Sequence, residues 1–393
     1  MKKLLFFIAL ILISLVTLAE AADLKFIYEF EGGQLYRAGK INVVVMHGSF
    51  HDMGRQYGAL LKPEFKEFYA MLEKKLGLGT KKAPMNEVVA MMKASLAEYP
   101  FYVQEWVRGM GETSGLGADK QIIACQALGP IISEGGCSGL FTWGDYTKDG
   151  STIAARNWDL GTTALEPYQK FLTVAVFNPT GFGQSVADIN YIGQIMWQTG
   201  MNQSGIFYDL QNGQMSDNQL TKNRLNTNSA LMSMLLDSTS LKQVDAFFDA
   251  VRPEVGLIIN VADAKQGYCY EWGTADYRRR VDDEKGLLAD SNHFVDSTWR
   301  STTAIPEGKI SGFTKERSAN LLTLGKKYKG QMDEAKMMRI FETTIPEGGP
   351  SFTKESGLKT YYSIVAIPKK LIFWLNVRDL QGWTEIDLKP LFK

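Results

Sequence analysis

The segment SEGGCSGL, residues 133–140, divides this sequence of 393 residues into two parts of different character. Before it, from about His51 to Leu128, apolar side chains recur at helical spacing. From Cys137 onward, short runs rich in valine, isoleucine, phenylalanine and tyrosine alternate with turn residues, which indicates strands. The predicted strands cover residues 170–177, 194–210, 256–272 and 361–377, with predicted helices at 228–236, 241–251, 315–326 and 333–342. Since no linker separates the parts, the pattern predicts one large α+β domain built in layers.

The chemistry of this segment centres on Cys137, which follows two glycines. Glycine permits backbone conformations that other residues rarely adopt, and a bent backbone brings a thiol to the carbonyl carbon of its own preceding peptide bond. The resulting thioester hydrolyses and leaves Cys137 as a new N-terminus. Its α-amine, with a pKa of about 8, can then act as general base for its own thiol. The sequence therefore predicts self-cleavage between Gly136 and Cys137.

A hairpin after Cys137 is predicted to bring a carboxylate to the new amine. The Asp-Gly pair at 149–150 is a strong turn signal between two strand-like runs. A loop of roughly two to four residues places Cys137 opposite residues 160–162. Asp159 then falls within a few residues of the cysteine, where its carboxylate holds the α-ammonium. The same register leaves Arg156 distant unless a bulge shifts the pairing.

A family resemblance joins these features. Gly136-Cys137, followed by Arg-Asn-Trp-Asp at 156–159, resembles the N-terminal nucleophile (Ntn) hydrolases of the choloylglycine hydrolase and acyl-CoA:6-aminopenicillanic acid (isopenicillin-N) acyltransferase families. The resemblance continues in chain order over residues 43 to 320. Its further motifs are His47-Gly48-Ser49, MGRQYG at 53–58, Gly-Met-Asn-x-x-Gly at 200–205, Asn212 seven residues after that last glycine, Ser291-Asn292-His293-Phe294, and Arg317 within Glu-Arg-Ser.

This resemblance implies a four-layer αββα sandwich preceded by a helical pro-segment. It also implies an enzyme that cleaves a linear, non-peptide amide C–N bond of a small N-acyl substrate through a thioester on Cys137, with no cofactor and no metal. Hydrolysis and acyl transfer both stay open, because water and an amine acceptor compete for the same thioester. In this family Asn212 would supply an oxyanion donor and Arg156 would favour the thiolate. Asn292 and Arg317 would complete the polar shell.

The N-terminus carries the pattern of a secretory signal peptide over residues 1–21. Two lysines precede an apolar run at 4–18, and Ala-Glu-Ala at 19–21 offers small residues for cleavage. The run is short for a membrane span, which needs about 20 apolar residues, although an uncleaved anchor stays an alternative. We therefore expect a secreted or periplasmic protein that has no stable membrane insertion once the signal is removed.

The two predicted cuts define three segments. The signal peptide covers residues 1–21, a mostly helical alpha chain covers 22–136, and the catalytic beta chain covers 137–393. We expect the alpha and beta chains to remain associated, because the helices before the cut and the strands after it must share apolar surface. The oligomeric state stays open.

Charge and histidine content weigh against other kinds of site. The formal net charge is zero, so the broad positive field that drives nucleic-acid binding is missing. His47 and His51 stand four residues apart, but Gly48 argues against a regular helix and no carboxylate pattern completes a metal site. Cys125 and Cys269 are interpreted as buried cysteines or as a disulfide.

Two alternatives to the self-cleaving enzyme remain. One is an unprocessed thiol protease in which His293 pairs with Cys137. The other is an exported binding protein that kept the fold without the activity.

Overall fold

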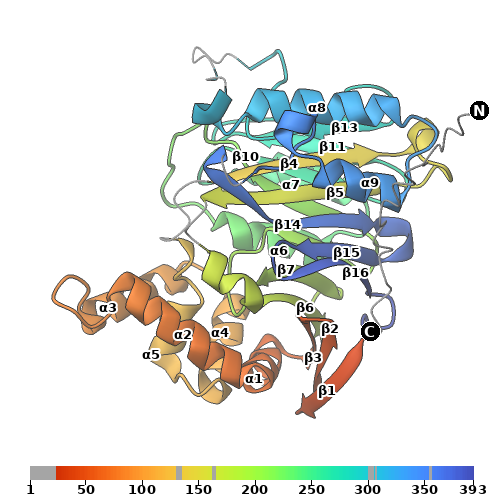
Figure 1. Cartoon of the computed structure of the whole chain (residues 1–393). Coiled ribbons are helices and arrows are strands. Elements are labelled where there is room, and N and C mark those ends of the chain that lie inside the picture. Colours follow the sequence, from red (N-terminus) through yellow and green to blue (C-terminus); the bar gives the residue numbers. More distant parts are fainter. Residues whose placement is uncertain (1–23, 130–134, 162–164, 300–304, 306–307, 354–355) are drawn as a thin grey trace, which may run out of the picture.

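Two stacked β-sheets with helices on their outer faces form the body of the protein (Figure 1). The structure is a computed structural model and describes residues 24–129, 135–161, 165–299, 305, 308–353 and 356–393. The predicted signal peptide lies outside these residues, as do Ser133 and Glu134 of the segment before the predicted cut.

The larger sheet has ten strands, and they come from both sides of Cys137. All neighbours run antiparallel except β3 and β6, which pair in parallel from Asn42–Thr173 to Gly48–Pro179. Its strands in spatial order are β1 (Lys25–Phe30), β2 (Gly33–Ala38), β3 (Ile41–Gly48), β6 (Leu172–Pro179), β7 (Val186–Tyr191), β8 (Thr199–Asn202), β9 (Phe207–Asn212), β10 (Leu257–Ala262), β11 (Gly267–Trp272) and β12 (Tyr277–Arg280). The strands before Cys137 are thus part of the same sheet as the strands after it.

The smaller sheet has six antiparallel strands and contains Cys137. Its strands in spatial order are β13 (Leu287–Asp290), β4 (Gly135–Thr142), β5 (Ile153–Gly161), β14 (Leu358–Ile367), β15 (Ile372–Val377) and β16 (Gln381–Asp387). The inner face of β4 meets β9 of the larger sheet, so Cys137 points into the space between the sheets.

Helices cover the outer faces and complete four layers. On the smaller sheet, α8 (Thr314–Lys327) and α9 (Glu334–Glu342) pack their apolar sides against β4, β5, β13 and β14. On the larger sheet lie α6 (Thr227–Asp237) and α7 (Leu241–Ala250), where the ring of Phe248 stacks on Tyr270 at 3.8 Å. The resulting order is helix, sheet, sheet, helix, which confirms the predicted αββα architecture.

The N-terminal helices gather at the end of the larger sheet that carries β3 and β6 (Figure 1). They are α1 (Phe50–Leu60), α2 (Lys62–Leu76), α3 (Met85–Ala97), α4 (Phe101–Thr113) and α5 (Ala118–Ala124). The backbones of α1 and α4 are in direct contact at Gly54. A Cβ at this position would lie only 2.2 Å from the carbonyl oxygen of Trp106, so a larger residue would not fit. The MGRQYG motif therefore has a packing role here.

The sequence prediction captured most of these elements. The structure adds strands β1 to β3 at the start of the predicted alpha chain, and also β7 and β13, which lie outside the predicted strand ranges. Among the described residues, no helix is long and apolar enough to cross a membrane. Cys125 and Cys269 are both buried and unpaired, so the disulfide that the sequence left open is not formed.

Candidate active site

The register of β4 and β5 differs from the predicted one by at least two residues. Cys137 pairs with Trp158, and Gly136 pairs with Asp159. The expectation that Cys137 faces residues 160–162 is therefore wrong. The reason is that the chain makes no tight turn at Asp149-Gly150: a loop of residues 143–152 separates β4 from β5, and it includes a short 3₁₀ turn at Gly144–Tyr146. The centre of the hairpin thus moves toward the N-terminus.

This register brings Arg156 to the cysteine. Arg156 pairs with Gly139, two residues along β4 from Cys137 and on the same face of the sheet. Its Nη2 lies 3.3 Å from the Sγ of Cys137. The prediction that Arg156 stands apart is corrected, since a diagonal neighbour with a long side chain reaches across the pair.

The guanidinium of Arg156 is fully buried and held between the two sheets. Nη1 donates to the carbonyl of Gln198 at 3.0 Å and to the hydroxyls of Thr199 and Tyr362, and Nη2 also donates to the carbonyl of Leu210. Burial raises the pKa of the Cys137 thiol, and the positive charge of Arg156 opposes that rise. The charge of Arg156, together with a smaller effect of Arg317, therefore favours a thiolate.

Asp159 lies on the opposite face of β5, toward helix α8. Its Oδ1 accepts a hydrogen bond from Thr360 at 2.6 Å, and its Oδ2 lies 3.7 Å from Nη1 of Arg317. Oδ2 has no hydrogen-bond partner among the described residues. Burial raises the pKa of Asp159 to about 6, although Arg317 opposes the rise. This unpartnered oxygen belongs to the residue paired with Gly136, directly beside the predicted cut.

Asn292 and Arg317 contact the backbone of Cys137 itself. The N–H of Cys137 donates to Oδ1 of Asn292 at 2.8 Å, and Arg317 donates to that same oxygen at 2.8 Å. Arg317 also donates to the carbonyl of Cys137 at 2.5 Å. Thr314, at the start of α8, accepts from the N–H of Asn292 at 2.7 Å and so fixes its place. The nitrogen that a cut would free is thus already held by a side-chain oxygen.

Asn212 ends β9 beside Asn292 and lines a cavity. Its carbonyl oxygen accepts from Nδ2 of Asn292 at 2.9 Å, and its own Oδ1 accepts from the N–H of Gln214 at 2.8 Å. Its Nδ2 has one contact, 3.5 Å from Oε1 of Gln214. Asn212 therefore shapes a turn and also places a weakly engaged N–H donor next to the site.

The structure does not pair His293 with Cys137. The Nδ1 of His293 lies 2.9 Å from Oγ1 of Thr314, whereas the side-chain partner of the sulfur is Arg156. Burial lowers the pKa of His293 to about 4, so the ring is neutral near pH 7. The arrangement lacks the hydrogen-bonded cysteine–histidine pair that the protease alternative needs.

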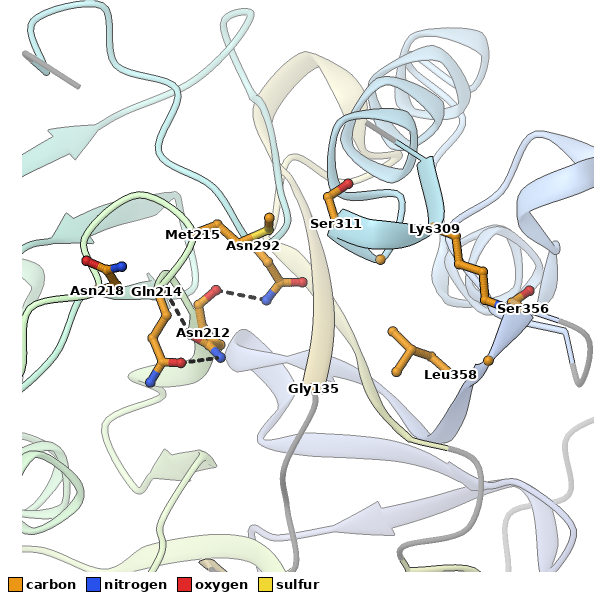
Figure 2. Close-up of a pocket in the computed structure, with 12 residues that line it drawn as sticks. Gly135, Asn212, Gln214, Met215, Asn218, Asn292, Lys309, Ser311, Ser356 and Leu358 are labelled. Atoms are coloured by element: carbon orange, nitrogen blue, oxygen red, sulfur yellow. Dashed lines mark hydrogen bonds between the residues drawn. The ribbon is translucent and has the colours of Figure 1, made fainter. Parts of the chain in front are cut away.

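A cavity of about 530 Å³ opens beside Gly135, at the start of β4. Figure 2 shows the amide side chains of Asn212, Gln214 and Asn218 on one side of this strand and Lys309 on the other. The site thus has both a buried thiol and an adjoining space for a small molecule. Among the described residues, no group of three or more His, Cys, Asp or Glu side chains is arranged to hold a metal.

Sequence reasoning missed a buried polar cluster behind Gly139. The Nε2 of Gln211 donates to Asp209 at 3.3 Å and also to Asp290, while Asn260 donates to Asp209 at 2.9 Å. Burial raises the pKa of both carboxyl groups. A Cβ at Gly139 would lie 2.8 to 3.0 Å from three of these side chains. No spacing rule brings the whole cluster together, because its four side chains come from three strands, β9, β10 and β13.

Thr360 and Thr314 were also missed. Both are threonines that act through another residue, since Thr360 binds Asp159 and Thr314 binds Asn292. For Thr314, the sequence feature that comes nearest to indicating a role is its position three residues before Arg317, about one turn away on α8.

The family model of acyl-coenzyme A:6-aminopenicillanic acid acyl-transferase matches residues 146–346, just over half of the chain. No curated protein sequence matches the chain.

Three solved structures are similar in shape. A variant of conjugated bile acid hydrolase from Clostridium perfringens has a TM-score of 0.47 and 14% identity, over 65% of this chain and 93% of that one. An N-acylethanolamine-hydrolyzing acid amidase ortholog from Caenorhabditis elegans has a TM-score of 0.42 and 14% identity, over 59% and 93%. Penicillin V acylase from Agrobacterium tumefaciens has a TM-score of 0.41 and 10% identity, over 64% and 86%.

Four layers around a buried Cys137, together with the family match, define an Ntn-type amide hydrolase or acyltransferase. The chain belongs to the acyl-coenzyme A:6-aminopenicillanic acid acyl-transferase family.

Proposed function

We propose that this protein is an exported enzyme that cuts its own chain between Gly136 and Cys137 and then cleaves linear N-acyl amides through a thioester on Cys137. The observation that carries the proposal is the setting of Cys137. Its sulfur lies 3.3 Å from Arg156, and its backbone nitrogen lies 2.8 Å from Oδ1 of Asn292. One residue thus has both a charge-supported thiol and an anchored nitrogen.

Maturation would use the thiol against the preceding carbonyl. The sulfur bonds to the carbonyl carbon of Gly136 while the bond from that carbon to the nitrogen of Cys137 breaks, and the thiol proton passes to this nitrogen. Water then hydrolyses the thioester, leaving a carboxylate on Gly136 and an α-ammonium on Cys137. The unpartnered Oδ2 of Asp159, opposite Gly136, offers that ammonium a counter-charge.

Turnover would repeat this chemistry on a substrate. The α-amine takes the thiol proton, the sulfur attacks the amide carbonyl, and the proton passes to the departing amine. Nδ2 of Asn212 supports the oxyanion, an interaction worth about 2.7–4 kcal/mol per donor. Water releases the acid, and an amine acceptor in its place would release a new amide. Asn292 and Arg317 hold the backbone of Cys137 in position during both steps.

The test is the N-terminal sequence of purified, active enzyme. We expect a fragment that begins Cys-Ser-Gly and a second fragment that copurifies with it. Cys137→Ala should give one intact chain with no amidase activity, while His293→Ala should be cut and active. An active enzyme that consists of a single uncut chain would contradict the proposal, and so would full turnover by Cys137→Ala.

Export is proposed from the N-terminal segment alone, which lies outside the described residues. Expression of the full chain in a bacterium, followed by fractionation, should place the protein outside the cytoplasm with residues 1–21 removed. Retention of residues 1–21 on a membrane-bound product would favour the anchor instead. Hydrolysis and acyl transfer are separated by adding a primary amine during turnover and measuring the ratio of acid to new amide.

A further inference from the structure

The cavity beside Gly135 is polar and has one charged side chain. Its described lining includes the polar residues Asn212, Gln214, Asn292 and Ser311 together with Lys309, and no described lining residue is acidic. Among the described lining residues, only Met215 and Leu358 have apolar side chains. Small-molecule pockets are usually lined by apolar groups with a few polar ones, so this lining favours a polar ligand over a long hydrocarbon chain.

Lys309 has no ion-pair or hydrogen-bond partner within the described part of the chain. Its side chain packs over Gly357, where a Cβ would lie 2.8 Å from Cε and 3.3 Å from Nζ of the lysine. Figure 2 shows Lys309 on one side of the start of β4 and Asn212 and Gln214 on the other side. The cavity therefore has one wall rich in amides and an opposite wall with Lys309, which has no counter-charge among the described residues.

The path of the chain shows which part of a substrate meets this charge. In the maturation step proposed above, the acyl group on the sulfur is Gly136 with the chain that precedes it. A substrate forms the same thioester, so its acyl group would take the direction in which Gly135 leaves Cys137. Gly135 itself lines the cavity. The space with Lys309 is thus continuous with the acyl side of the scissile bond.

From this arrangement we infer that the enzyme prefers substrates whose acyl group carries a carboxylate, and that Lys309 binds that carboxylate. The inference rests on the proposed function. It names the substrate class as half-amides of short dicarboxylic acids and related acyl groups that end in an anion. Lys309 is a specificity residue and takes no part in bond breaking.

The test compares two chromogenic amides of equal chain length, N-glutaryl-p-nitroanilide and N-pentanoyl-p-nitroanilide. Wild type should hydrolyse the glutaryl compound with a kcat/KM roughly fivefold higher, the usual size for one solvent-accessible ion pair. Lys309→Gln should remove this preference through KM, Lys309→Arg should keep it, and Lys309→Glu should reverse it. High salt should reduce it in wild type.

A second measurement does not depend on turnover. The cut enzyme is treated with 4-maleimidobutanoic acid or its neutral amide, and labelling of Cys137 is followed by mass spectrometry. Wild type should react faster with the acid, and Lys309→Gln should react equally with both. Equal rates in wild type overturn the inference and leave the proposed function intact. A chain that is never cut and hydrolyses neither anilide overturns the proposed function as well.

Discussion

The Sγ of Cys137 and the Nη2 of Arg156 lie 3.3 Å apart, although the two residues are not partners across the hairpin. The contact runs diagonally over Gly139, the actual partner of Arg156. The guanidinium is anchored at its far side by Thr199 and Tyr362, so its position does not depend on the cysteine. A fixed cation beside a buried thiol is the physical basis of the first prediction.

Removing the charge of Arg156 should raise the pKa of the Cys137 thiol. An opposite charge at this distance typically shifts a pKa by about 1–3 pH units, so Arg156→Met should slow alkylation by iodoacetamide at pH 7 by at least tenfold. Arg156→Lys retains a charge and should fall between Met and wild type. The measurement is the pH dependence of alkylation at Cys137. An unchanged profile in the Met variant, with an unchanged Tm, would show that the arginine does not act on the thiol.

Asn212 allows a matched test of its two roles. Asn212→Asp keeps the oxygen that accepts from the N–H of Gln214 and so keeps the turn, but it lacks the N–H donor. Asn212→Ala lacks both. If the donor stabilises the oxyanion, each variant should lose about 10²–10³-fold in kcat with little change in KM. Near-normal kcat in the Asp variant, beside a slow Ala variant, would assign Asn212 to the turn alone.

Asp159 should make the uncut protein less stable as pH rises. Its pKa is raised by burial from 3.8 to about 6, so the folded state binds the proton more tightly than the unfolded state. Stability therefore falls between about pH 4 and pH 6, by ~3 kcal/mol in total. An asparagine at position 159 cannot ionise, so a variant that carries it should not lose folding stability over this pH range.

The comparison for Asp159 uses Cys137→Ala as the background, so that both proteins stay uncut. Asp159→Asn in that background should match its parent in urea unfolding at pH 4 and exceed it at pH 7. A constant difference across this range would mean that Asp159 titrates alike in both states. In the cleavable chain, Asp159→Asn should fold but lose most activity, because the α-ammonium loses its counter-charge.

Gly139 should tolerate substitution less well than Gly136. A Cβ at Gly139 would lie 2.8 Å from Nε2 of Gln211 and 2.9 Å from Nδ2 of Asn260, whereas a Cβ at Gly136 meets nothing closer than 3.5 Å. Gly139→Ala should destabilise the protein by about 1–3 kcal/mol through overpacking. Gly136→Ala should fold normally and affect only the rate of cutting. Calorimetry of both variants in the Cys137→Ala background checks this order, and equal Tm values would contradict it.

Most regular elements after Cys137 were predictable because their periodicity is strong, although β7 and β13 were not predicted. The helix predicted at 315–326 is found at 314–327, and the apolar run at 361–377 forms the hairpin of β14 and β15. The strands before α1 were not predicted. The first of them, β1, is mostly exposed and carries no buried stripe that would mark it.

The order of motifs along the chain was enough to predict which residues belong to the site. The pairing of β4 with β5, which sets the distances between these residues, was not predicted correctly. Asp159 was placed near Cys137, but Arg156 was placed too far away, because the loop between β4 and β5 covers residues 143–152 in place of the expected tight turn at Asp149-Gly150. Side chains that converge from separate strands, such as Asp209 and Asp290, leave no mark in the sequence. Lys309 lies in a short turn before α8, where no pattern distinguishes a cavity wall from solvent.

The parallel pairing of β3 with β6 bears on how the enzyme responds to denaturation. These strands lie on opposite sides of Cys137 and are joined in register from Asn42–Thr173 to Gly48–Pro179. If the chain is cut as proposed, one sheet is built from two polypeptides. The intact chain can refold in a single-molecule process, whereas the cut pieces must first meet in solution, at a rate that falls with dilution. Heating should therefore be reversible for Cys137→Ala and largely irreversible for the mature enzyme, whose working lifetime is then set by its unfolding rate.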